Sequence, residues 1–477
     1  MSEITYLSSY VPKVSRPSRS TKTTWAGLNR QNTQDTGEIS DGRNVFMRDY
    51  PFISSAKGAS EKWLPPEGHK IVSLHSTGEN SFVVITHYEG RLYFNYVADE
   101  NTVFTDDFAD YEEGVVPSVA AFNTYSGSGN NIVSATYTRR ILLYPYCLSF
   151  DPSASTPALL SFNTSGNSVP KLDKVVVYGG RVFGVLKGKF YASEWNNYAG
   201  WRLNTATNTS TDLAWVSTTQ SDIDASGEFT AIAAYDNHVI GFKRNFMHMI
   251  YNNKAPFRIV DIAKIGALSQ EAVCVCGQKL FFVSDDGVYV FGGGYPSRIS
   301  DKLNVKDYDG AVLGCDDSTV YCYVPSENTV FTYDTVYNVW GSVDGAPKMC
   351  TTIVNDCYYA TEDAVYCFGD GDYGEFFLET DSTMGGALAE KKMNRLRVQA
   401  SHPSHSEGDY LCIEALKGDG SVALTKNYYP THDGDYIYSM LTRMTCDFGV
   451  KIRISGHGEW KIKYLQIDYS SGGESYV

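Results

Sequence analysis

The segment KLFFVSDDGVYVF, residues 279–291, holds two apolar runs on either side of the polar turn SDDG. Short runs rich in β-branched and aromatic residues, separated by a few turn residues that include glycine, predict a β-hairpin. Six other segments share this order of an apolar run, a short polar turn and a second run rich in tyrosine or phenylalanine. They are FVVITHYEGRLYF (82–94), NIVSATYTRRILLY (131–144), RVFGVLKGKFYAS (181–193), HVIGFKRNFMHMI (238–250), TVYCYVPSENTVFTY (319–333) and CYYATEDAVYCF (357–368).

The seven predicted hairpins recur at a nearly regular spacing. Their first runs begin at residues 83, 133, 182, 239, 280, 320 and 357, so successive starts lie 37 to 57 residues apart. A strand unit repeated at roughly this period is typical of a β-propeller, in which each hairpin belongs to a four-stranded blade. The pattern predicts an all-β chain with a propeller of about seven blades, six to eight, over residues 61–384. A succession of ordinary antiparallel meanders is the alternative interpretation.

The two ends of the chain depart from this repeat. Residues 385–477 contain longer, alternating runs such as KIRI (451–454), which predict a small antiparallel β-sandwich. Residues 1–60 are polar and basic. Within them we expect an extended docking arm over 1–25 and, over 44–53, a strand that closes the propeller ring. The basic residues of the predicted arm include Lys13, Arg16, Arg19 and Lys22.

Charge is unevenly distributed along the 477 residues. The net charge is −15, with +4 in residues 1–30, +1 in residues 391–477 and therefore −20 in between. An acidic body of this kind repels nucleic acid. The stretch DENTVFTDDFADYEE (99–113) contains no base, and we interpret it as a solvated loop or as a surface that faces a DNA path or a basic partner. Its acidic residues are Asp99, Glu100, Asp106, Asp107, Asp110, Glu112 and Glu113.

Targeting signals and disulfides are not expected. The first twenty residues lack the apolar core of a secretory leader, and no run of 18 apolar residues occurs. The ten cysteines are too sparse for a disulfide scaffold. We therefore expect free thiols in a reducing compartment and no insertion into a membrane.

Motifs for catalysis and for metal binding are missing from the sequence. It contains neither G-x-S-x-G nor G-x-x-x-x-G-K-[ST], and SDDGVYVF (284–291) lacks the Thr-Trp of a sialidase box. The cysteine spacing matches no zinc site. His402 and His405, with Glu407 and Asp409, offer ligand atoms but are interpreted as a solvated loop. The sequence predicts no enzyme, no catalytic residue, no metal and no cofactor.

Four stretches resemble the tail-hub family of short-tailed bacteriophages, the packaged-DNA-stabilisation proteins and related nozzle proteins. They are GLNRQNTQDTGEISDGRNVFMRDYPFIS (27–54), YDNHVIGFKRNFMHMIY (235–251), VFTYDTVYNVWGSV (330–343) and TRMTCDFGVKIRISGHGEWKIKYLQIDY (442–469). The resemblance is diffuse but covers most of the chain, in the order basic arm, propeller and sandwich. It implies a structural virion protein, assembled in the host cytoplasm into a homo-oligomeric ring around the DNA channel. The implied neighbours are portal, adaptor and receptor-binding proteins, and DNA passes without specific binding.

A glycan-binding or glycan-cleaving propeller for host-receptor recognition is the alternative function. Trp195, Trp201 and Trp215 fall within one predicted blade, with Asn196 and Asn197 between them. Aromatic side chains stack on sugar rings, and they also fill the core between blades. The state of assembly separates the two functions, because the first needs a ring whereas a glycosidase can act alone.

Overall fold

The computed structural model forms two compact units. The propeller unit comprises Lys57–Asn338 and Val343–Asp372, and the C-terminal unit comprises Met1–Ala56, Val339–Ser342 and Tyr373–Val477. The predicted division into 1–60, 61–384 and 385–477 differs from this one, because the C-terminal unit draws on both ends of the chain. No helix within the described residues is long and apolar enough to cross a membrane. The residues described are 17–31, 37–78, 80–126, 136–163, 168–203, 211–217, 227–251, 254, 257–382, 391–417, 420–446 and 450–471.

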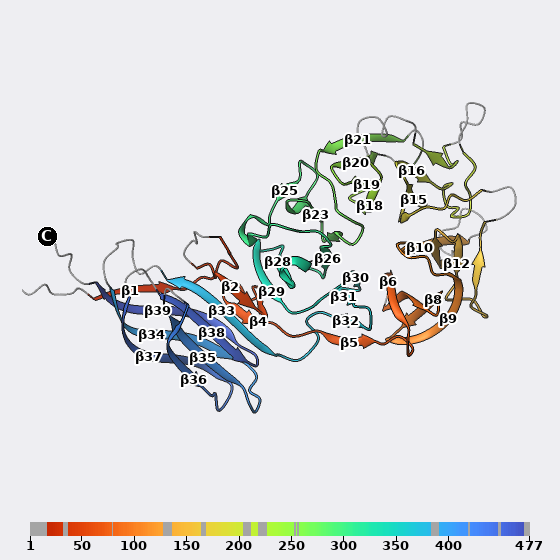
Figure 1. The fold of residues 1–477 in the computed structure, drawn as a ribbon. Helices are drawn as coiled ribbons and strands as arrows, with labels where there is room; N and C mark the ends of the chain where they lie inside the picture. The colour runs from red at the N-terminus through yellow and green to blue at the C-terminus, as the bar shows by residue number, and fades with distance from the viewer. Residues whose placement is uncertain are drawn as a thin grey trace, which may run out of the picture. The chain divides into compact units, whose positions relative to one another are not determined.

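Six four-stranded antiparallel sheets and a further blade that contains β26, β27 and β28 follow one another around the propeller unit (Figure 1). They confirm the predicted propeller of about seven blades. In the part of the chain that the structure describes, two short 3₁₀ helices, Asp301–Leu303 and Pro325–Glu327, lie between strands. The first blade consists of β6 (Lys70–Gly78), β7 (Ser81–Tyr88), β8 (Arg91–Ala98) and β9 (Asn101–Asp110), and the second of β10 (Ser118–Ser126), β11 (Thr136–Tyr144), β12 (Leu148–Phe150) and β13 (Leu159–Ser161). The third consists of β14 (Lys174–Tyr178), β15 (Arg181–Leu186), β16 (Lys189–Ala192) and β17 (Trp215–Val216), the fourth of β18 (Phe229–Tyr235), β19 (His238–Lys243), β20 (Phe246–Tyr251) and β21 (Arg258–Ala263), and the fifth of β22 (Val273–Cys276), β23 (Lys279–Ser284), β24 (Gly287–Phe291) and β25 (Ser297–Arg298). The sixth contains β26 (Val312–Cys315), β27 (Thr319–Val324) and β28 (Thr329–Asp334), and the seventh consists of β30 (Met349–Ile353), β31 (Asp356–Ala360) and β32 (Val365–Cys367) with β5 (Ser60–Trp63).

Six of the seven predicted hairpins are strand pairs of the blades, namely β7–β8, β15–β16, β19–β20, β23–β24, β27–β28 and β31–β32. The segment 131–144 is different. Residues 136–144 form one strand, β11, which pairs with β10 rather than folding back on itself. Its polar residues Arg139 and Arg140 lie within this strand, so the interruption of the apolar pattern does not mark a turn. Residues 131–135 lie outside the described part of the chain.

The ring is closed by a strand from the N-terminal side of the propeller. β5 pairs antiparallel with β32, with Trp63 opposite Val365 and Ser60 opposite Cys367. The strand predicted to close the ring, 44–53, was therefore placed too early. Within that stretch and just after it, β3 (Val45–Phe46) and β4 (Ile53–Ser55) pair with each other, and β4 pairs with β39 (Lys461–Ser471) of the C-terminal unit.

Apolar side chains fill the space between neighbouring blades. Phe242 of β19 and Phe282 of β23 are buried with their ring centroids 5.0 Å apart, and they belong to one cluster that joins two blades. Gly241 shows how tight this packing is, because a Cβ there would lie 2.2 Å from Cζ of Phe190. Burial of apolar surface contributes about 25 cal/mol per Å², so the contacts between blades stabilise each blade against its neighbours.

The C-terminal unit contains two antiparallel sheets, which form the predicted sandwich. Within this unit one sheet has the order β29-β3-β4-β39-β34-β37 with β1 also on β39, and the other has the order β2-β33-β38-β35-β36. Burial alternates strictly along β38, as expected for strands with one face in a core. The remaining strands are β1 (Pro17–Lys22), β2 (Asp41–Arg43), β29 (Val339–Val343), β33 (Glu375–Ser382), β34 (Lys391–His402), β35 (Tyr410–Leu416), β36 (Val422–Tyr428), β37 (Gly434–Cys446) and β38 (Val450–His457).

Part of the predicted N-terminal arm is a strand of this unit. β1 pairs with β39 in a continuous register from Pro17 opposite Ser470 to Lys22 opposite Leu465. The expectation of an extended arm over 1–25 is thus wrong for residues 17–22, because the backbone of β39 offers hydrogen-bond partners that the sequence alone does not reveal. Lys13 and Arg16 lie outside the described residues.

Candidate functional site

The acidic residues of 99–113 lie at the outer edge of the first blade. Residues 101–110 form β9, which pairs with β8 and ends its sheet, so this stretch is an edge strand and not the predicted loop. Asp99 and Glu100 form the turn before it, both with positive φ. Most of the side chains of β9 are exposed. We call the seven carboxylates Asp99, Glu100, Asp106, Asp107, Asp110, Glu112 and Glu113 the acidic edge.

Two basic residues compensate part of the acidic edge. Arg91 lies 2.7 Å from Asp110 and also binds Asp107, while Lys62 lies 2.8 Å from Glu100. Within the described part of the chain, the other four carboxylates make no ion pair. The hydrogen bonds that the Lys62 ammonium donates to Asp370 and Glu100 raise the pKa of Lys62, which therefore stays charged. Charged side chains on an exposed edge strand prevent indiscriminate strand pairing, so any partner of this edge must supply positive charge.

A surface of opposite charge lies on the sheet of the C-terminal unit that contains β34. Apolar residues such as Leu396 and Val398 are buried on the inner side of β34, whereas Arg397 between them is not buried. Asp468 on β39 binds Arg19 of β1 at 2.8 Å, and Asp435 binds Lys463 at 2.7 Å. We call six of the basic residues of this sheet the basic face: Arg19, Lys392, Arg395, Arg397, Arg443 and Lys463.

The predicted arm residues contribute to the C-terminal unit unequally. Arg19 belongs to the basic face. Lys22 is half-buried, and its ammonium donates to the backbone oxygen of Glu38 and to the hydroxyl of Thr380. The sequence did not indicate the basic face, because its residues come from four strands that are distant along the chain.

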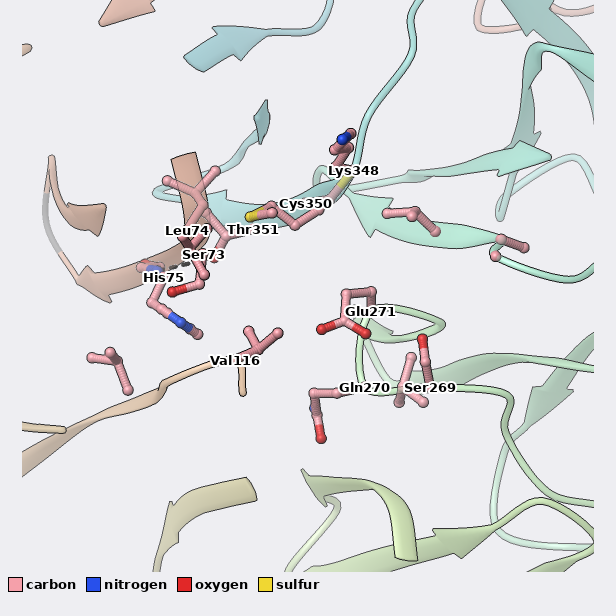
Figure 2. A pocket seen from close by; sticks show the side chains of 18 residues that line it. Ser73, Leu74, His75, Val116, Ser269, Gln270, Glu271, Lys348, Cys350 and Thr351 are labelled. Carbon is pink, nitrogen blue, oxygen red and sulfur yellow. Dashed lines mark hydrogen bonds between the residues drawn. The ribbon is translucent and has the colours of Figure 1, made fainter. Parts of the chain in front are cut away.

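The innermost strands of the propeller unit surround a cavity of about 660 Å³ (Figure 2). Its wall includes residues of β6, β10, β22, β26 and β30, from five of the seven blades. Glu271 is the one carboxylate among the lining residues, and Lys348 lies on the same wall. Gln270 is fixed in place, because its amide both accepts from and donates to the backbone of Ile232.

His75 also faces this cavity. Its Nε2 lies 3.1 Å from the backbone oxygen of Pro117. Burial lowers the pKa of His75 to about 4, so the ring is neutral at pH 7. Glycosidases of the common type use a pair of carboxyl groups, one as acid and one as base or nucleophile. The described residues of the cavity wall include one carboxylate, Glu271, rather than such a pair.

The aromatic and cysteine residues considered for binding are mostly part of the core. Trp201 is 6% exposed, and Trp215 packs on Phe257 at 4.7 Å between centroids. Trp195 is 38% exposed and carries the ammonium of Lys254 over its ring. Nine of the described cysteines are free thiols, and six of these nine are buried.

His402 and Asp409 correct the prediction of a solvated loop, because both are buried. Together with exposed His405 they are the one group of three or more histidine, cysteine or acidic side chains in the described residues that is close enough to hold a metal ion. Glu407, the fourth residue considered, is exposed and does not belong to this group.

No family model and no curated protein matches the chain. Among solved structures it is similar to the extracellular domain of a hybrid two-component system from B. thetaiotaomicron, at 9% identity and TM-score 0.34, over 74% of this chain and 47% of that one. It is also similar to an exo-β-1,3-galactanase from Phanerochaete chrysosporium, at 9% identity and TM-score 0.27, over 87% of this chain and 100% of the other. A third similarity is to a sialidase from Trypanosoma rangeli, at 7% identity and TM-score 0.28, over 94% and 96%. Likenesses this weak carry no argument about function.

Proposed function

We propose that this chain is a structural subunit of a homo-oligomeric ring in the tail of a short-tailed bacteriophage. The tail assignment is supported by the four stretches that resemble the tail-hub family, and by the order of propeller and sandwich along the chain. In the virion the ring would surround the DNA path and contact portal, adaptor or receptor-binding proteins.

The observation that carries the ring is the pair of oppositely charged surfaces. The acidic edge holds seven carboxylates with two basic partners, and the basic face holds six basic residues with Asp435 and Asp468. A surface that is complementary to a different surface of an identical copy produces a head-to-tail contact, and such contacts close into rings when the rotation allows it. Opposite potentials also steer the two copies together and select the register of the contact.

Exposed apolar side chains accompany both surfaces. Ile437 and Leu441 on β37 are 62% and 63% exposed, and Val103 on β9 is 61% exposed. Apolar side chains among charged ones are typical of the centre of a protein contact, where their burial contributes to affinity. In the proposed ring these three side chains would be covered by the neighbouring copy.

The experiment is a comparison of two charge-reversed variants by light scattering. Asp106→Lys with Glu113→Lys reverses charge on the acidic edge, at carboxylates that form no ion pair within the described residues. Glu228→Lys with Asp356→Lys makes the same charge change at exposed sites elsewhere on the propeller unit. We expect the wild type and the second variant to form rings at low salt, and the first variant to remain monomeric. High salt should weaken the wild-type ring because it screens the contact.

Glycan binding is the second candidate, and the cavity favours it. A volume of about 660 Å³ is in the range of sites for small ligands, and its wall carries polar groups such as those of Glu271 and Lys348. Screening the full-length protein against a panel of host glycans tests this function. Binding that is lost in Glu271→Gln would favour the glycan function, and the absence of hydrolysis is expected because a second carboxyl group is missing from the wall.

A further inference from the structure

The group formed by His402, His405 and Asp409 lies at one end of the C-terminal unit. β34 ends at His402, β35 begins one residue after Asp409, and the loop between them contains His405. The two strands belong to different sheets of the sandwich. His402 is 0% exposed and Asp409 is 3% exposed, whereas His405 is open to solvent. The group therefore joins the two sheets at this end and has one accessible side.

The ring of His402 is held in one orientation. Its Nδ1 lies 2.6 Å from the backbone oxygen of Glu459, so Nδ1 carries a hydrogen and donates it to that oxygen. The ring also stacks on Trp460, with centroids 4.2 Å apart and planes 17° from parallel. These two contacts leave Nε2 as the free nitrogen, directed toward the loop.

Nε2 of His402 faces an oxygen atom of a carboxylate. It lies 3.2 Å from Oδ2 of Asp409 but makes no hydrogen bond within the described part of the chain. With the hydrogen on Nδ1, a neutral ring directs the lone pair of Nε2 at the lone pairs of a carboxylate oxygen. This arrangement is repulsive in a buried site, and a positive charge between the two atoms would make it attractive.

Asp409 is positioned by groups other than His402. The backbone N–H of Ser406 donates to Oδ2 at 2.7 Å, and Nδ1 of His457 lies 3.1 Å from Oδ1. Gly458 leaves room for this carboxylate, because a Cβ there would lie 2.4 Å from Oδ1. The carboxylate is therefore built into the fold and is not a loop side chain that happens to point inward.

We propose that His402 Nε2, a ring nitrogen of His405 and the carboxylate of Asp409 bind a divalent transition metal of the zinc class. The candidate ligand atoms all lie within 4.8 Å of one another. A separation of 3.2 Å between Nε2 and Oδ2 is close to the edge of a tetrahedron with zinc–ligand distances of about 2.0–2.2 Å. Histidine ligands of zinc usually donate their other N–H to a carbonyl or carboxylate, as His402 does to Glu459. Solvent on the side of His405 would supply the fourth ligand.

This metal would be structural, since it ties the end of β34 to the start of β35. It is independent of the proposed ring, because none of the three ligands belongs to the basic face or the acidic edge. A metal that binds the folded state alone raises stability in proportion to the logarithm of its concentration above the dissociation constant.

The test is calorimetric titration of the full-length protein with zinc after removal of metals by a chelator. We expect one equivalent of zinc to bind and to raise the unfolding temperature of the C-terminal unit. His405→Ala removes an exposed ligand without opening the core, and His432→Ala removes an exposed histidine outside the group. Loss of a group that only supports a metal ligand typically lowers metal affinity 10- to 100-fold, and loss of a ligand should cost at least as much. We therefore expect zinc affinity to fall by at least this factor in His405→Ala and to stay at the wild-type value in His432→Ala.

Cobalt(II) gives a second readout that does not depend on stability. Bound in a tetrahedral site it should produce visible absorption bands that zinc displaces, in the wild type and in His432→Ala only. Zinc binding that is equal in both variants, or no binding at all, would overturn the proposal. A nuclear magnetic resonance spectrum that shows a proton on both nitrogens of His402 at neutral pH in the presence of zinc would also overturn the proposal. In that case a proton, and not a metal ion, would supply the positive charge between Nε2 and the carboxylate of Asp409.

Discussion

The propeller unit and the C-terminal unit are built from strands that find their partners in different ways. Within a propeller blade, strands that are consecutive in sequence pair with each other, whereas β5 crosses from the start of the chain segment to pair with β32 of the last blade. In the C-terminal unit many pairs join distant segments, such as β1 with β39 and β2 with β33. Pairing between neighbouring strands appears in the sequence as a repeated pattern of two apolar runs around a turn. Pairing between distant strands appears only as an alternation of apolar and polar residues within each strand. We therefore expect that each unit is stabilised by its own set of contacts and that one unit can be destabilised without the other.

The largest effect on the free energy of unfolding is expected from replacing a buried tryptophan in one of the two units. Trp460 is 0% exposed in the C-terminal unit, and Trp63 is 6% exposed in the propeller unit, where its indole donates to Thr102 at 2.8 Å. Replacing a buried tryptophan with alanine typically costs about 3–5 kcal/mol. We expect Trp460→Ala to lower the free energy of unfolding of the C-terminal unit by this amount, and Trp63→Ala to do the same to the propeller unit.

Amide hydrogen exchange measures the two units in one experiment. In Trp460→Ala, protection should fall in β34 and β38 and persist in β19 and β23. In Trp63→Ala the pattern should be reversed. Equal loss of protection in both units, in either variant, would show that they unfold as one cooperative body.

Acid should destabilise the propeller unit through buried histidines. Burial lowers the pKa of His75 to about 4, and it also lowers the pKa of His69 and His248. The unfolded chain takes up a proton near pH 6.5, before the folded chain does, so stability is full above that pH and is lost as pH falls toward 4. For His75 the loss is at most about 3 kcal/mol, and less to the extent that cavity water reaches the ring.

The matched variant for this effect is His75→Gln, which cannot take up the proton. Its free energy of unfolding, measured from denaturant curves between pH 4 and pH 7, should vary less with pH than that of the wild type. An unchanged pH dependence would place the acid sensitivity in other groups.

The smallest effect on stability is expected on the basic face. Arg395→Glu with Arg397→Glu changes charge on half-buried side chains whose stems stay on the sheet surface. Such surface substitutions usually change the free energy of unfolding by less than about 0.5 kcal/mol. At high salt, where the proposed ring is screened, thermal unfolding of the variant should therefore match that of the wild type. A large drop in unfolding temperature would assign these residues to the fold rather than to a contact.

The same contrast explains what the sequence predicts and what it does not. The hairpin at 279–291 forms from adjacent residues, so its pattern identified β23 and β24 and, with its repeats, the propeller. The sequence predicts a closing strand at 44–53, because any short apolar segment before the first blade fits that role, and only pairing with β32 selects 60–63.

The candidate sites follow this rule as well. The acidic edge is contiguous in sequence and was visible, although its strand structure was not. The basic face combines Arg19 with residues from 392 to 463, so only the folded sheet brings it together. The sequence does not reveal the burial of His402, because the groups that contact its ring, Glu459 and Trp460, lie more than 50 residues away. Asp409 likewise contacts His457, which is distant in sequence.

The most direct test of the proposed ring mixes two variants that each lack one half of the contact. The first variant carries Asp106→Lys and Glu113→Lys on the acidic edge, and the second carries Arg395→Glu and Arg397→Glu on the basic face. Each should be monomeric by light scattering at low salt. In an equimolar mixture the acidic edge of the first variant, now positive, can bind the basic face of the second variant, now negative. The unaltered acidic edge of the second variant can bind the unaltered basic face of the first. The account predicts rings of alternating copies in the mixture, and a mixture that contains only monomers would contradict it.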